Sequence, residues 1–300
     1  MNNIGLAVIG QTGSLAPADK TLYALRDVTS TVDSLPLIAG SIMSKPLASG
    51  ADAIVLDVKT GSGATMHTLE GSIELGQAMV DIGQLAGKPV VALVTGMAQP
   101  LGTHIGNALE VKEAIDVLAG RTKGDLLEVS LMLGSRMLIL AGKAKDEDDA
   151  RAQLLDALQS GRAMDKLKAM IRAQGGDPAV CDDVSLLPQP AVIREVKCGV
   201  NGFVSEMDTT ALGLAAQAMG AGRMKKTDKL DYSVGFVLPL RIGDKVTPDT
   251  TFCTLYARSD ADADTAEKAI RAAVGFSDKQ PVPPPLCYAV ITKDGIQRMV

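Results

Sequence analysis

The sequence predicts an α/β fold in which helices flank a mixed, largely parallel sheet, followed by a C-terminal α+β module. The first observation is that short apolar runs at residues 4–9, 53–58 and 89–94 are typical of fully buried strands. The second is that helical stretches separate these runs, as in parallel sheets with crossover helices. Hydrophobic residues make up 46% of the 300 residues, which is enough for a sizeable core.

Two helices are expected between the first and second strands. The first should run from Pro17 to about Leu25, with proline and aspartate in its first turn. The second should start at Ser34, whose side chain can cap it. It should end by Lys45, because Pro46 disfavours helical geometry in the residue before it.

The rest of the chain divides near a proline-rich boundary at residues 186–190. Before it, helices are expected over 69–86 and 107–118, and the pattern stays helical from 126 to about 175. After it, short β runs surround one helix, so residues 190–300 are interpreted as a smaller α+β domain. The expected β runs are 191–193, 202–204, 234–237 and 251–256, with a helix over 212–219.

Composition and charge exclude several classes of function. The net charge is −5 and no long basic run is present, whereas a nucleic-acid backbone binder needs a clustered positive surface. Aromatic residues make up only 3%, which also disfavours base stacking as a binding mode. No stretch approaches the about 20 apolar residues of a membrane span. Partners are therefore expected to be small molecules, with neither nucleic acid nor membrane among them.

The cysteines favour a cytoplasmic protein. All four are widely separated, and no CxxC pair is present that could supply a zinc site. We expect buried free thiols in a reducing compartment.

Three polar side chains near the N-terminus form the candidate binding site. Ser41 and Lys45 lie four apart on one predicted helix, so both point to one face, and Arg26 lies fifteen residues earlier. A guanidinium, an ammonium and a hydroxyl together suit a planar ligand with carbonyl oxygens, such as a uracil or thymine ring. The alternative is that Arg26 pairs with Asp27 or Asp33 and that Lys45 is a solvated surface charge.

Long motifs carry a resemblance to a known family. Residues 21–66 read TLYALRDVTSTVDSLPLIAGSIMSKPLASGADAIVLDVKTGSGATM. Shorter motifs are GQTGSLAPADK at 10–20, GNALEVKEA at 106–114, GFVSEMDT at 202–209 and DYSVGF at 231–236. Together they resemble the pyrimidine nucleoside phosphorylases and thymidine phosphorylases over essentially the whole chain.

The resemblance implies a domain organisation of the nucleoside-phosphorylase type. Residues 1–13 would hold the first strand of the α/β domain, 14–48 the remnant of a helical domain, 49–189 the α/β domain and 190–300 the C-terminal module. Whole enzymes of this kind are homodimers that associate through the helical domain, so any dimer of this chain is expected to be altered.

The resemblance also implies a reaction and a set of contacts. Arg26, Ser41 and Lys45 fall on the base-binding positions, and Tyr23 and Ile38 fall on positions that flank the ring. The reaction is reversible phosphorolysis in nucleoside salvage, in which phosphate attacks C1′ and releases the base and a pentose 1-phosphate. No organic cofactor is implied.

A potassium site is implied as well. Bacterial members of the family often bind this ion through backbone carbonyls at the positions of Leu101 and His104 and through the carboxylate of Glu113. Oxygen ligands suit a hard cation. Asp57 and Lys59 follow the end of a predicted strand, where ligand sites of α/β proteins gather, and a structural ion pair is an equal alternative.

The chain departs from the family pattern in one major respect. The glycine- and serine-rich phosphate segment of the family lies upstream of the residues present here, so phosphate-binding residues are absent. The apolar run at 4–9 also begins unusually close to Met1 for a buried strand. The sequence therefore predicts a truncated chain that is inactive alone. Rival interpretations are a non-catalytic pyrimidine-binding module and a related phosphoribosyltransferase.

The truncation hypothesis predicts that the isolated chain does not cleave thymidine or uridine in the presence of phosphate. The reason is that no group that could position the attacking phosphate is identified in it. Release of free base, followed by chromatography, measures this directly. Robust turnover by the isolated chain would refute the hypothesis.

Overall fold

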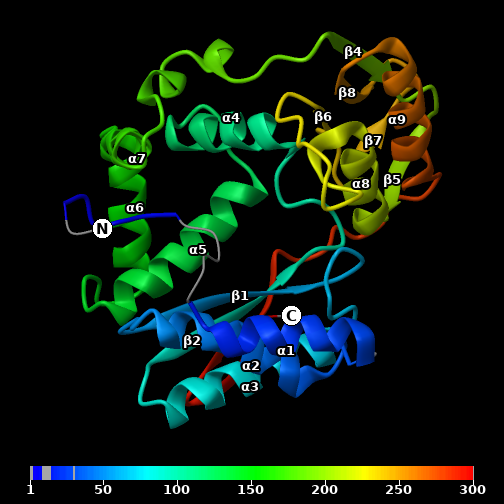
Figure 1. Ribbon diagram of the computed structural model, residues 1–300. Coiled ribbons are helices and arrows are strands. Elements are labelled where there is room, and N and C mark those ends of the chain that lie inside the picture. Colours follow the sequence, from blue (N-terminus) through cyan, green and yellow to red (C-terminus); the bar gives the residue numbers. More distant parts are fainter. Residues whose placement is uncertain (1–2, 9–14, 30, 300) are drawn as a thin grey trace. The chain divides into compact units, whose positions relative to one another are not determined.

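The computed structural model describes residues 3–8, 15–29 and 31–299, and these fold into two units, each with its own buried core (Figure 1). The first unit is Met1–Gly96, Glu128–Asp156 and Pro285–Val300, and the second is Met97–Leu127 and Ala157–Pro284. The predicted mixed α/β class is confirmed. Within the described ranges, no helix is long and apolar enough to cross a membrane.

The first unit contains a mixed four-stranded sheet in the order β1-β2-β10-β11. Strands β1 (Ile54–Thr60) and β2 (Val90–Gly96) pair in parallel along their whole length. Strands β10 (Cys287–Thr292) and β11 (Gly295–Arg298) continue the sheet in antiparallel fashion. The sheet is mixed as predicted, but among its described strands only the β1–β2 pair is parallel, so it is less parallel than expected.

Helices cover both faces of this sheet because its strands are apolar on both sides. Side chains alternate along β2, so Ala92 joins the core beside α3 (Leu69–Leu85). Val91 and Leu93 point to the opposite face and pack with residues of α5 (Asp125–Leu140). Burial on both faces explains why the predicted strands read as continuous apolar runs.

Helix α3 is fixed at its start and along its packed side. The Thr68 hydroxyl caps it by accepting a hydrogen bond from the Gly71 amide at 3.2 Å. Further along, a Cβ at Gly76 would lie 2.6 Å from Cδ1 of Ile291 in β10. Any larger residue here would have to displace the end of the Ile291 side chain, so glycine lets α3 pack closely on this strand.

Helix α2 (Leu35–Ala48) differs from its prediction at the C-terminal end. The expectation that it ends by Lys45 is wrong, because the helix continues through Pro46. Proline removes one amide donor, but the carbonyls of the last turn still accept hydrogen bonds. Ser49 N donates to Lys45 O at 2.9 Å and Ala51 N donates to Pro46 O at 3.2 Å. These bonds keep the last turn helical.

The segment before the helices also differs from its prediction. Residues 6–8 of the expected first strand have no secondary structure, and residues 9–14 lie outside the described residues. A buried strand needs neighbouring strands to satisfy its backbone, and no partner strand is present for these residues in the described part. Helix α1 (Pro17–Thr29) follows and ends among β-branched residues, about one turn later than expected.

The second unit consists of two small antiparallel sheets with helices around them. The first sheet has the order β3-β6-β8-β4 and the second has the order β7-β5-β9. The strands are β3 (His104–Ile105), β4 (Val192–Lys197), β5 (Gly202–Met207), β6 (Gly235–Val237), β7 (Lys245–Val246), β8 (Thr251–Ala257) and β9 (Val274–Ser277). The helices are α4 (Asn107–Leu118), α7 (Arg162–Ala173), α8 (Thr209–Ala216) and α9 (Asp260–Ala272), while α6 (Glu147–Gln159) runs from one unit into the other along the chain.

The predicted domain boundaries differ from the two units. Residues 190–300 were expected to form one module, but β10 and β11 pair with β2 in the first unit. Residues 97–127, expected in the α/β domain, belong to the second unit. The physical reason is that the edge of β2 opposite β1 needs partners for its backbone N–H and C=O groups, and β10 supplies them although it is distant in sequence.

The position of β10 predicts unequal effects of two alanine substitutions. Ile291 in β10 is fully buried, whereas its cross-strand neighbour Ile296 in β11 is 46% exposed. Ile291→Ala should lower the free energy of unfolding by about 2–5 kcal/mol. Ile296→Ala should change it by about 0.5 kcal/mol or less. Urea unfolding measures both, and equal effects would contradict the packing of β10 in this core.

Candidate functional site

Helix α2 places Ser41 and Lys45 one turn apart at the margin of its buried face. Ile38, Ala39 and Met43 are buried in the core of the first unit, while Ser41 lines a groove and Lys45 is partly exposed. Residues four apart share a face, so Ser41 and Lys45 lie together. The two predicted residues therefore come together on a helix that is fixed by its buried side.

The Lys45 ammonium is held by three contacts. It lies 2.8 Å from Oδ2 of Asp19, 2.6 Å from the Ser41 carbonyl oxygen and 3.3 Å from the Ser41 hydroxyl. These contacts use its three N–H donors and aim the charge at the side of α2 that carries Ser41.

Asp19 is a site residue that sequence reasoning missed. It lies in the first turn of α1, and its side chain is 10% exposed. Burial raises its pKa, but hydrogen bonds from Lys45 and Ser41 and the nearby positive charges of Lys45 and Arg26 outweigh this, so the pKa of Asp19 is lowered. The sequence feature that could have predicted Asp19 as a site residue is its spacing of two helical turns from Arg26. This spacing places both residues on one face of α1.

Arg26 is buried, with only 6% of its surface exposed. Nη1 donates to the Leu37 carbonyl at 3.4 Å and Nη2 donates to the Val32 carbonyl. Within the described residues, Nε has no hydrogen-bond partner. No ion pair with Asp33 is found there either, and the Asp27 side chain lies outside the described part.

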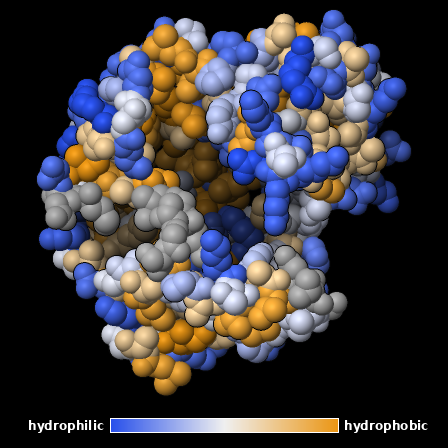
Figure 2. Space-filling model, viewed as in Figure 1, coloured by the Kyte–Doolittle hydropathy of each residue, from blue (hydrophilic) through white to orange (hydrophobic). Residues whose placement is uncertain are grey.

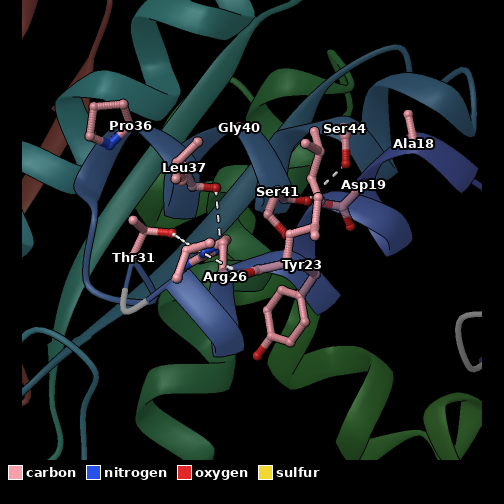
Figure 3. A pocket seen from close by; sticks show the side chains of 13 residues that line it. Ala18, Asp19, Tyr23, Arg26, Thr31, Pro36, Leu37, Gly40, Ser41 and Ser44 are labelled. Atoms are coloured by element: carbon pink, nitrogen blue, oxygen red, sulfur yellow. Dashed lines mark hydrogen bonds between the residues drawn. The ribbon is translucent and has the colours of Figure 1, made fainter.

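The two helices enclose a groove of about 480 Å³ (Figure 3). Tyr23, Arg26 and Ser41 line it together with Asp19, and the Arg26 guanidinium carbon lies 5.3 Å from the centre of the Tyr23 ring. Apolar side chains complete its walls, and Figure 2 shows apolar surface where Figure 1 places α1 and α2. The groove thus combines an aromatic ring, apolar walls and charged groups.

Two predicted residues do not line this groove. Ile38 is 8% exposed and belongs to the core, so it does not face the groove. Its neighbour Leu37 lines the groove instead. Lys45 reaches the groove only through its contacts with Asp19 and Ser41.

Asp57 and Lys59 form an ion pair at the end of β1. Lys59 Nζ lies 2.8 Å from Oδ2 of Asp57 and donates to the Thr95 hydroxyl at 2.8 Å. The Thr95 hydroxyl donates in turn to Asp57 Oδ1. Each of these three side chains has a partner in this closed network. The network matches the alternative that Asp57 and Lys59 form a structural ion pair.

Glu113 lies on the buried side of α4 and organises the loop before it. Its carboxylate accepts hydrogen bonds from Thr103 N at 2.7 Å, Thr103 Oγ1 at 2.8 Å and His104 N at 3.3 Å. Because the Thr103 hydroxyl gives its one hydrogen to Glu113, the imidazole Nδ1 of His104 must donate to that hydroxyl, at 2.8 Å. A Cβ at Gly102 would lie 2.2 Å from Oε2 of Glu113, so the loop backbone packs directly on the carboxylate.

The Glu113 carboxylate is negatively charged in the folded chain. Burial raises its pKa, but hydrogen bonds from His104 and Thr103 outweigh burial and lower the pKa to about 2. The residue is only 4% exposed, so Glu113 is not a solvated helix residue.

Comparison with known proteins gives two family matches and a set of close relatives. Residues 1–164 match the glycosyl transferase family a/b domain, and residues 203–277 match the pyrimidine nucleoside phosphorylase C-terminal domain. A pyrimidine-nucleoside phosphorylase of Staphylococcus aureus (strain USA300) is 48% identical over 293 residues, which is 98% of this chain and 67% of the relative. One of Bacillus subtilis (strain 168) is 53% identical over 257 residues, which is 86% of this chain and 59% of the relative.

The chain belongs to the pyrimidine-nucleoside phosphorylase family. It spans about two thirds of the length of its staphylococcal relative. The predicted resemblance and fold class are thereby confirmed.

The potassium site that the family implies does not fit the residues around Glu113. The Leu101 carbonyl, one of the expected ligands, accepts a hydrogen bond from Nη2 of Arg241 at 3.2 Å. The guanidinium is a permanent positive charge, so a potassium ion at the same carbonyl would be repelled by it. Glu113 directs its oxygens at amide and hydroxyl donors of the loop.

The charge of Glu113 predicts a specific loss of stability in acid. Its folded-state pKa of about 2 lies below the ordinary value of 4.5, so its contribution is complete above pH 4.5 and disappears as the pH falls towards 2. This shift corresponds to about 3 kcal/mol. Glu113→Gln should therefore flatten the pH dependence of the free energy of unfolding between pH 5 and pH 2.

Chemical denaturation over this range measures the effect. Glu74→Gln, at an exposed carboxylate on α3, is the matched control and should keep the pH dependence of the parent chain. An unchanged acid profile for Glu113→Gln would contradict the assignment.

Proposed function

We propose that this chain is the base-binding part of a pyrimidine-nucleoside phosphorylase and that the groove between α1 and α2 holds the pyrimidine. The reaction is reversible phosphorolysis of a pyrimidine nucleoside to the free base and a pentose 1-phosphate. The staphylococcal and Bacillus relatives, both called pyrimidine-nucleoside phosphorylases, support the activity. The groove volume of about 480 Å³ supports a small planar ligand, because small-molecule sites occupy about 300–1,000 Å³.

The buried guanidinium of Arg26 carries this proposal. Its Nε hydrogen has no acceptor in the described residues, although the side chain is almost completely buried and lines the groove. A buried donor without a partner costs about 1–3 kcal/mol. A carbonyl oxygen of a uracil or thymine ring would satisfy it once the side chain turns this covered nitrogen towards the groove, and the Tyr23 ring next to the guanidinium offers an aromatic surface for the ring plane.

The positive charges suit the chemistry of the departing base. When the glycosidic bond breaks, negative charge moves onto the pyrimidine and its carbonyl oxygens. Arg26 and Lys45 would stabilise this charge more strongly in the transition state than in the bound nucleoside, which lowers the barrier. Ser41 would fix the orientation of the ring through its hydroxyl, since it sits on the helix that the core holds rigidly.

Asp19 determines how strongly Lys45 can stabilise negative charge on the base. Its carboxylate neutralises part of the ammonium charge at 2.8 Å, and the weakest Lys45 contact is the 3.3 Å contact with the Ser41 hydroxyl. A base oxygen would replace this weak contact and leave the ion pair in place. Lys45 would thus bind the base without the full free-energy cost of desolvating an unpaired cation.

We also place the protein in the cytoplasm. All four cysteines are free thiols, and burial raises the pKa of Cys253 to about 12, which makes it unreactive. Free buried thiols support a reducing compartment.

The proposal predicts that Arg26→Ala weakens binding of thymine and uracil by at least about tenfold, because hydrogen bonds to charged groups contribute about 1.5–3 kcal/mol. Isothermal titration calorimetry measures the affinity. Arg121→Ala removes an exposed arginine that pairs with Asp116 and should leave the affinity unchanged.

Unchanged base affinity of a folded Arg26→Ala variant would refute the assignment. The same titration with ribose 5-phosphate distinguishes a nucleoside phosphorylase from a phosphoribosyltransferase. Tight binding of the sugar phosphate without binding of the base would favour a phosphoribosyltransferase.

A further inference from the structure

Arg241 is a partly buried cation whose position neither the sequence patterns nor the base site explains. It lies between β6 and β7, and its side chain is 20% exposed. Nη2 donates to the Leu101 carbonyl at 3.2 Å, and Nε lies 3.5 Å from Oδ2 of Asp125. The arginine therefore connects two parts of the second unit that are about 140 residues apart in sequence.

The surroundings of Arg241 hold its charge in one place. Its backbone amide donates to Oδ2 of Asp244 at 2.7 Å, which fixes the start of the β7 turn. Gln99 accepts a hydrogen bond from Ile242 N at 2.8 Å and donates to Asp125 at 3.3 Å. This double contact ties the backbone of the β7 turn to the carboxylate that pairs with the guanidinium.

Burial does not remove the charge of Arg241. Burial lowers its pKa, while the nearby carboxylates of Asp125, Glu113 and Asp244 act in the opposite direction. An arginine guanidinium stays protonated in proteins even so. Glu113 is one of these carboxylates, and its side chain lines the same cavity as Arg241.

Leu101, Gly102, Thr103, Glu113 and Arg241 surround one small cavity of about 210 Å³, together with Asp125 and Lys123. Its two carboxylates are matched by two cationic side chains, so the cavity has no excess negative charge that would attract a further cation.

We propose that the guanidinium of Arg241 is the resident cation of this site, which holds the Leu101 carbonyl and neutralises Glu113 so that potassium is not taken up. The inference concerns the second unit alone and stands independently of base binding between α1 and α2. Arg241 acts as a positioning residue for the loop from Leu101 to His104.

The test compares potassium chloride with choline chloride at equal ionic strength. Thermal unfolding and calorimetric titration with potassium are measured for the parent chain, Arg241→Met and Arg241→Lys. Methionine keeps an unbranched apolar side chain without the charge, and lysine keeps the charge. Arg121→Met, at an exposed arginine of the same unit, is the control for a general loss of charge.

The expected result is that the parent chain and Arg241→Lys unfold at the same temperature in both salts, within about 1 °C, and give no binding heat with potassium. Arg241→Met should unfold about 3 °C or more lower in choline chloride. Potassium should then restore part of this loss in a saturable way, because the vacated place beside Leu101 and Glu113 accepts the ion. Arg121→Met should show no potassium response.

A saturable, potassium-specific rise of the unfolding temperature in the parent chain would overturn the proposal. An Arg241→Met variant that ignores potassium would also overturn it, since guanidinium and ion would then not share one place. If Arg241→Met does not fold, the potassium titrations of the parent chain and of Arg241→Lys decide the question.

Discussion

The burial of one side of α2 against the core of the first unit is the constraint on which the candidate site depends. Ile38, Ala39 and Met43 fix the rotation of the helix, and helical spacing then places Ser41 and Lys45 beside the buried face, where Ser41 lines the groove. The site is therefore built on a rigid element, and its orientation comes from apolar packing that takes no part in ligand contact.

The opposite wall of the groove is held in a different way. Helix α1 bears exposed apolar residues, and its described links to α2 include the Asp19–Lys45 ion pair and the hydrogen bond from Arg26 to the Leu37 carbonyl. The groups that connect the helices are thus the groups proposed to contact the base. Ligand binding and the position of α1 are coupled for this reason. In the second unit, Arg241 and Glu113 similarly use opposite charges to fix a loop.

Local sequence patterns predicted the helices and strands whose apolar residues are continuous or recur at a regular spacing. The strands β1 and β2 and the helices α3 and α4 lie close to their predicted bounds, because burial on both faces or on one helical side leaves a direct trace in the sequence. The pairing of β10 with β2 could not be predicted from local pattern, since it joins segments about 190 residues apart. Asp19 was missed for a related reason: its role depends on contact with a lysine on another helix, and no local pattern records that contact.

The central claim, that the groove between α1 and α2 binds a pyrimidine, is tested most directly by a crystal structure of the chain with 5-bromouracil. The anomalous signal of bromine locates the ring without prior assumptions. The account predicts a bromine peak in this groove, with a ring oxygen about 3 Å from the Arg26 guanidinium and another close to Ser41. A ring bound elsewhere, with Arg26 still donating to the carbonyls of Val32 and Leu37 and no ligand beside it, would contradict the account.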